Sequence, residues 1–124
     1  MNPEELRART RAFALDVIDL CLQFGNDDLA RLVRPQLLRA GTGVAFNYRA
    51  ANRSRSRREF GSKLAIVLEE ADESELWLDV LTVRRYGPQD VVARLRGEAV
   101  ELRAIFAASR ATVVDRSRKR RRVV

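Results

Sequence analysis

Five arginines fall within ten residues near the middle of the chain: Arg49, Arg53, Arg55, Arg57 and Arg58. A guanidinium can bind a phosphate through two parallel hydrogen bonds, and the free N–H groups at the start of a helix add to the attraction. Because this cluster brackets an expected turn between two helices, we predict that it binds the phosphates of a nucleic acid. A solvated helix face, with its arginines paired to acids, is the alternative interpretation. The adjacent Tyr48 could stack on a base, but its heptad position predicts a core residue.

A second basic segment lies at the C-terminus. Residues 110–124 hold seven basic side chains and one acid, a net charge of +6, so residues 1–109 contribute only +1 to the total of +7. Six of these cations follow Asp115: Arg116, Arg118, Lys119, Arg120, Arg121 and Arg122. Because residues 115–124 repel one another and lack an apolar period, we predict a disordered basic tail that supplies most of any affinity for RNA or DNA. A GC-rich genome would also explain 22 arginines against two lysines.

The chain has no histidine, which is the usual general base for serine and cysteine nucleophiles and a common metal ligand. Five carboxylates do lie close together in sequence: Glu69, Glu70, Asp72, Glu73 and Glu75. Metal sites in helical bundles pair each glutamate with a histidine three residues later, so we expect these acids to be structural. The sequence therefore predicts no catalytic residue, no metal and no cofactor, and we expect that the protein is not an enzyme.

These acids belong to a charge pattern along the chain. Residues 31–58 contain eight arginines and no acid, whereas residues 59–85 contain seven acids and three bases. The pattern predicts ion pairs between two consecutive helices, within one chain or across subunits, each stabilising by about 0–1 kcal/mol when exposed. Such pairs would neutralise part of the basic surface.

Capping and stop signals predict four helices, at about residues 3–24, 28–52, 57–85 and 88–114. The sequence Ser-Arg-Arg-Glu at 56–59 is a capping box, which places the third helix start at Arg57. Pro35 predicts a kink in the second helix or its true start, and Gly41 allows a neighbouring helix to approach closely. Residues 1–114 thus form one domain, followed by the tail.

Apolar residues in each predicted helix recur at alternating spacings of three and four, as at Leu64, Val67 and Ala71. This period is typical of an all-α, up-and-down antiparallel four-helix bundle. The first and third helices carry further apolar residues outside the seam: Leu15, Ile18, Leu22, Ile66, Leu76, Trp77 and Val80. A lone bundle would expose this second stripe to water, so we predict that it forms the interface of a homo-oligomer.

The sequence has no run of about 18 apolar residues that could span a membrane, and its N-terminus is acidic. A single cysteine, Cys21, cannot form an internal disulfide, which suits a reducing compartment. We therefore expect a cytoplasmic protein with no membrane partner.

Two stretches resemble the signatures of a known family. The first signature is resembled by residues 35–47, PQLLRAGTGVAFN. The second is resembled by residues 59–60, EF, followed by residues 69–78, EEADESELWL. The family is the four-helix bundle proteins of intervening sequences in bacterial 23S ribosomal RNA genes, which are similar to the accessory protein of diversity-generating retroelements. The resemblance extends to about Val113.

This resemblance implies a bundle assembled as a ring-shaped homopentamer, with no established enzymatic activity. For the retroelement relative it also implies binding of nucleic acid and of a reverse transcriptase. Two positions depart from the family pattern, because Gly43 replaces the usual serine and Ala50 a frequent glutamate. Partner contacts made by those two side chains do not carry over.

The leading hypothesis is a non-enzymatic oligomer that binds RNA or DNA electrostatically, as an accessory to a nucleic-acid-processing partner such as a reverse transcriptase. The alternative is a protein-interaction scaffold with no nucleic-acid role, in which the tail only keeps the particle soluble.

Overall fold

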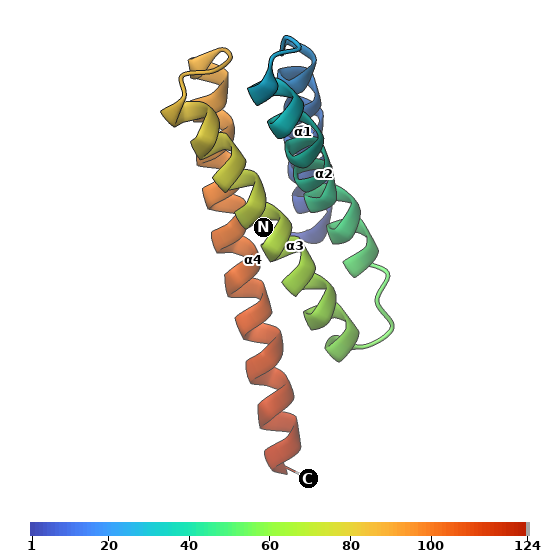
Figure 1. The fold of residues 1–124 in the computed structure, drawn as a ribbon. Coiled ribbons are helices and arrows are strands. Elements are labelled where there is room, and N and C mark those ends of the chain that lie inside the picture. Colours follow the sequence, from blue (N-terminus) through green and yellow to red (C-terminus); the bar gives the residue numbers. More distant parts are fainter. Residues whose placement is uncertain (124) are drawn as a thin grey trace.

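The computed structural model describes residues 1–123, most of which lie in four helices. They are α1 (Pro3–Leu22), α2 (Asp28–Ala51), α3 (Arg57–Val83) and α4 (Gln89–Val123). Each helix packs on the next, and α4 also contacts α1, so the chain forms the predicted up-and-down four-helix bundle (Figure 1). Within residues 1–123, no helix is long and apolar enough to cross a membrane.

Helices α1, α2 and α3 each begin behind a polar side chain that accepts a backbone hydrogen bond from the first turn: Asn2, Asp27 and Ser56. At α3, the Glu59 N–H donates to the Ser56 hydroxyl at 3.1 Å, and the Glu59 carboxylate accepts the Arg55 N–H at 3.2 Å. These bonds satisfy N–H groups that a helix start otherwise leaves free. The predicted start of α3 at Arg57 is confirmed.

The other helix bounds differ slightly from the predicted ones. Helices α1 and α3 end at Leu22 and Val83 rather than at 24 and 85, and α2 ends at Ala51. Arg85 and Gly87 have φ angles of 51° and 80°, which cannot continue a right-handed helix. The suggestion that α2 starts at Pro35 is wrong, because the helix runs unbroken from Asp28.

The largest difference is at the C-terminus, where α4 continues past the predicted end at Val114 to Val123. The prediction of a disordered segment from residue 115 is therefore wrong for residues 115–123. That prediction rested on charge repulsion, whereas the high helix propensity of arginine and lysine favours the helix. In addition, the Lys119 ammonium lies 3.4 Å from the Asp115 carboxylate one turn earlier, a pairing that favours helix.

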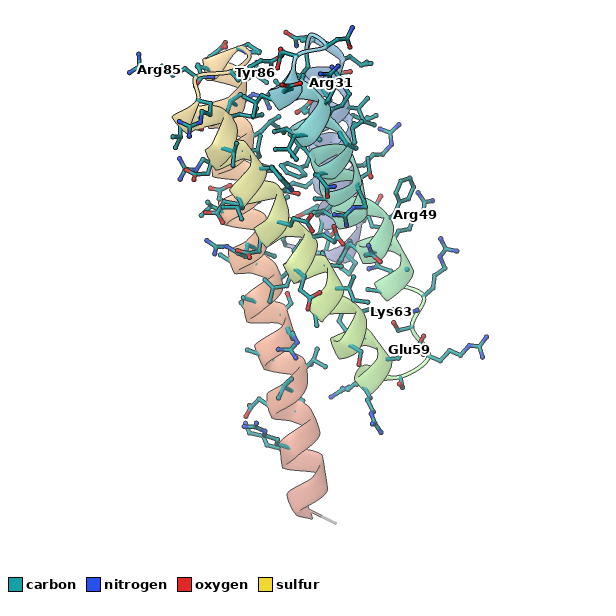
Figure 2. All side chains as sticks on the ribbon, in the orientation of Figure 1. Arg31, Arg49, Glu59, Lys63, Arg85 and Tyr86 are labelled. Atoms are coloured by element: carbon teal, nitrogen blue, oxygen red, sulfur yellow. The ribbon has the colours of Figure 1, made fainter. Side chains whose placement is uncertain are left out.

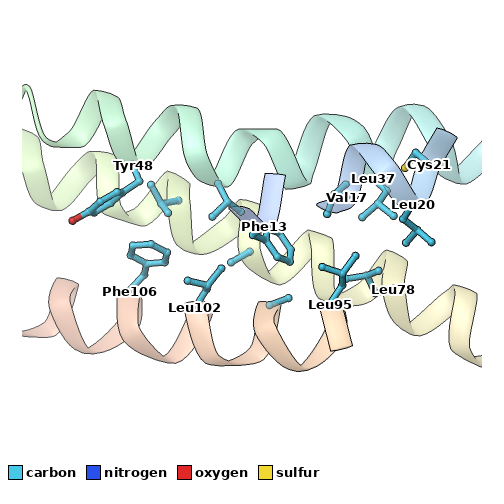
Figure 3. Close-up of a cluster of buried hydrophobic side chains, with 14 of the residues drawn as sticks. Phe13, Val17, Leu20, Cys21, Leu37, Tyr48, Leu78, Leu95, Leu102 and Phe106 are labelled. Carbon is cyan, nitrogen blue, oxygen red and sulfur yellow. The ribbon is translucent and has the colours of Figure 1, made fainter. Parts of the chain in front are cut away.

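The core follows the predicted seams, and Figure 3 shows side chains from all four helices meeting along the bundle axis. Tyr48 is buried, and its ring centroid lies 5.3 Å from that of Phe106. The prediction that Tyr48 is a core residue is confirmed. Close packing at Gly41 is also confirmed, because a Cβ atom there would lie 2.8 Å from Val17 Cγ1 in α1.

Candidate nucleic-acid interface

Four arginines from two helices line one groove at the end of the bundle where α3 begins. Arg57 and Arg58 come from the first turn of α3, and Arg110 and Arg118 come from the second half of α4. The groove has a volume of about 320 Å³, and Gly61, Ser62, Val113 and Val114 complete its lining. We call this set of eight residues the basic groove.

Gly61 and Val113 bring the two walls of the basic groove together. Gly61 is buried, and a Cβ atom built on it would lie 3.3 Å from Val113 Cγ1. A Cβ atom at this position would therefore require the Val113 side chain to shift by a few tenths of an ångström. Arg57 and Arg58 sit at the positive end of the α3 dipole, which adds to their attraction for an anion.

The acid nearest to the start of α3 is neutralised locally. Figure 2 shows Lys63 and Glu59 close together on α3, and their charged groups are 3.0 Å apart. This contact, with the hydrogen bond from the Arg55 N–H, holds the pKa of Glu59 below its ordinary value. The Glu59 charge is thus paired with Lys63, and in residues 1–123 none of the four groove arginines forms an ion pair.

The structure separates the other predicted arginines from this groove. Arg53 and Arg55 are exposed in the connection between α2 and α3. Arg49 projects from α2 (Figure 2) and lines a different groove between α1 and α2, together with Arg7 and Arg11. The predicted cluster is therefore divided between two surfaces.

On the last turns of α4, Arg116 and Lys119 are exposed and Arg118 reaches the basic groove. Arg120, Arg121 and Arg122 were also predicted to bind nucleic acid. Their backbone belongs to α4, but their side chains lie outside the part of the chain that the structure describes. Arg110 was not predicted as a site residue. Arg110 belongs to the basic segment 110–124, but the sequence alone does not show that this part of α4 packs against α3.

Among residues 1–123, the predicted ion pairing between the second and third helices occurs at one position, where Arg39 of α2 lies 2.6 Å from Glu73 of α3. Glu59 pairs with Lys63 of its own helix, and the remaining paired acids of α3 contact α4 instead. Arg96 pairs with Asp79 at 3.0 Å, and Arg103 pairs with Glu75 at 3.1 Å. The arginines at the α2–α3 connection consequently keep their charge available.

The predicted interface residues divide into two groups. Leu15, Leu22, Ile66 and Leu76 are exposed, whereas Ile18, Trp77 and Val80 are half-buried. The last two pack against the core of their own chain, so they are not wholly free for a neighbour. Phe46, with 72% of its surface exposed, is an apolar residue that the prediction missed. Phe46 lies outside the heptad seam of α2, and an apolar residue outside the seam predicts exposure or an interface.

Cys21 is buried, and burial raises the pKa of its thiol to about 11. A nucleophilic cysteine needs the opposite shift. Within residues 1–123, no three acidic or cysteine side chains are grouped as a metal site would require.

Comparison with known proteins identifies the fold family. The model of the 23S rRNA-intervening sequence protein family matches residues 5–108, most of the bundle. The chain belongs to this family. A crystal structure of a Bacteroides thetaiotaomicron protein of unknown function, from the S23 ribosomal protein family, is also similar, with 26% identity and a TM-score of 0.81. The similarity covers 90% of this chain and 99% of that one. No curated protein sequence matches.

The match to the family ends before Arg110, so the α4 side of the basic groove lies beyond the matched residues. Both family signatures lie within the matched residues 5–108. They meet where Gly43 of α2 faces Glu70 of α3. A Cβ atom on Gly43 would be 2.9 Å from Glu70 Oε2, a buried oxygen with no hydrogen-bond partner. Gly43 therefore provides the space that the Glu70 side chain occupies.

Replacing Glu70 by glutamine is expected to stabilise the bundle slightly at pH 7. Burial, and then the charge of Glu73, raise the pKa of Glu70 above 4.5. The folded protein thus holds this proton more tightly than the unfolded chain, and stability falls as pH rises between the two pKa values. Between pH 4 and pH 7, the melting temperature of Glu70→Gln should rise more, or fall less, than that of the exposed control Glu69→Gln. Equal pH dependence in both variants would contradict this.

Proposed function

We propose that this protein is a non-enzymatic, oligomeric bundle that binds RNA or DNA electrostatically through the basic groove and the last turns of α4. The observation that supports this most strongly is the convergence of four guanidinium groups on one groove, with no ion pair to any of them among residues 1–123. Guanidinium groups at that density repel one another, and a phosphate backbone would relieve the repulsion. Contacts of this kind carry no base sequence information, so binding is expected to be largely independent of sequence.

The family relationship supports an accessory role. The matching family is named for proteins of 23S rRNA intervening sequences, and its similarity to the retroelement accessory protein extends the proposal to a protein partner. That partner would be a reverse transcriptase or another enzyme that processes nucleic acid.

Fluorescence anisotropy with two unrelated labelled oligonucleotides, measured from 50 to 300 mM NaCl, tests the proposal. Each phosphate contact contributes about −0.9 to the slope of log affinity against log salt for duplex DNA, so four groove arginines predict a slope near −3.6. Both sequences should bind with similar affinity. Absence of binding at 50 mM NaCl, or a flat slope, would favour the scaffold alternative.

We also propose that the groove between α1 and α2 docks a second copy of the chain. Its lining combines apolar side chains, among them Leu15, Ile18 and Phe46, with the arginines Arg7, Arg11 and Arg49. The outer side of α3 offers a complementary stripe, because exposed Ile66 and Leu76 flank the acidic Glu69. These two surfaces differ, so the contact is heterologous and closes into a ring, for which the family resemblance favours a pentamer.

The variant Phe46→Asp is expected to lower the molar mass of the protein in solution. The substitution places a charge among the apolar side chains of this groove, which should cost the assembly at least about 2 kcal/mol per interface. Light scattering at 10 µM should give an oligomer for the unmodified chain and a smaller species for the variant. A monomeric unmodified chain at that concentration would contradict the proposal.

A further inference from the structure

The last turns of α4 form a helical arm beyond the bundle, which we define as residues 114–123. Figure 1 shows α4 extending well past the start of α3 and past the α2–α3 connection. Among the described side chains of α4, Val113 is the last that packs against the core, and Asp115, Arg116 and Lys119 are exposed. At 1.5 Å per residue, the arm projects by about 15 Å.

Cations cover the arm on several sides. Side-chain directions on an α-helix advance by about 100° per residue, so Arg116, Arg118 and Lys119 point in three different directions. One of them, Arg118, turns back into the basic groove. A helix with cations on three sides suits a position between two phosphate backbones better than contact with a single strand.

We propose that this arm lies in the major groove of double-stranded, B-form DNA while the basic groove holds a flanking phosphate backbone. This inference rests on the proposed function and specifies its ligand. A helix with its side chains is about 10–12 Å wide and the B-DNA major groove is about 12 Å wide, whereas the major groove of duplex RNA is too narrow and deep. Single strands are held by aromatic stacking, and the lining of the basic groove contains no aromatic ring.

The arm is helical in the structure, and bound DNA should stabilise that helix further. Isolated helices of about ten residues are marginal in water, and like charges one turn apart weaken them further. DNA phosphates would neutralise those charges, so the affinity for duplex DNA should depend on the helix propensity of the arm.

A charge-neutral substitution series at Ser117 tests this dependence. Alanine, serine, glycine and proline have decreasing helix propensity at an interior position, and the three variants keep the net charge of +7 of the unmodified serine chain. Affinity for a 20-base-pair DNA should fall in that order, with proline at least tenfold weaker than alanine. Melting temperatures should stay within a few degrees, because the variants lie beyond the buried core.

Duplex RNA and single-stranded DNA of the same sequence are the matched probes. Ser117→Pro should change their binding less than twofold. If proline leaves the DNA affinity unchanged, the arm acts only as a flexible charge; if it weakens all three ligands equally, the helical arm does not select duplex DNA. Either result makes the inference wrong, although the proposed function stands. If the unmodified chain binds none of the three, the proposed function itself fails.

Discussion

Gly41→Ala is expected to reduce the free energy of unfolding by about 1 kcal/mol, although alanine is the better helix former. The new Cβ atom would lie 2.8 and 2.9 Å from the two methyl carbons of Val17, which is fully buried. Valine has one strongly preferred rotamer in a helix, so it cannot turn away and α1 and α2 must separate. Overpacking of this kind costs roughly 1–3 kcal/mol, and the gain in helix propensity offsets only about 1 kcal/mol of it.

Gly97→Ala is the matched control, because Gly97 is an exposed helical glycine with no atom within 4 Å of the added Cβ. It should raise stability by about 1 kcal/mol. Urea denaturation followed by circular dichroism measures both variants. If they shift stability in the same direction, the close contact between α1 and α2 does not exist in solution.

The double variant Arg57→Gln, Arg58→Gln is expected to lower the affinity for nucleic acid about tenfold to hundredfold at 150 mM salt. It removes both α3 cations from the basic groove. The slope of log affinity against log salt should become less steep by about two, because each lost phosphate contact removes close to one. Both residues are exposed, so the melting temperature should barely change.

Arg84→Gln, Arg85→Gln is the control for net charge. It also removes two positive charges, in this case from exposed positions just after the other end of α3. Affinity should fall by no more than about threefold and the slope should stay the same, since the lost effect is long-range and screened. Equal losses in the two double variants would mean that overall charge, and not the basic groove, determines binding.

Much of the fold could be predicted from the sequence because local signals determine it. The seam residues Leu64, Val67 and Ala71 repeat with the period of a bundle helix, and all three are buried. The start of α3 follows from the side-chain chemistry of Ser56 and Glu59. The end of α4 could not be predicted, because helix propensity and charge repulsion oppose each other in residues 115–123 and their balance has no local signature.

The candidate site was predicted only in part, because it depends on which helix faces which. The acids of α3 could have paired with the arginines of α2 or of α4, and the sequence order favoured α2. In the structure Asp79 and Glu75 face Arg96 and Arg103 of α4, which leaves the connection arginines unpaired. Arg110 joins Arg57 and Arg58 only because α3 and α4 pack together at Gly61 and Val113.

The central claim is that phosphates bind in the basic groove, and the amide signal of Gly61 tests it most directly. Selective ¹⁵N-glycine labelling gives six glycine signals, of which Gly61 lines the groove and Gly25 and Gly87 lie in the connections at the opposite end of the bundle. During titration with a 20-base-pair DNA at 50 mM salt, the Gly61 signal should shift or broaden while those of Gly25 and Gly87 stay in place. A Gly61 signal unchanged at saturation, or equal changes in all three, would contradict the account.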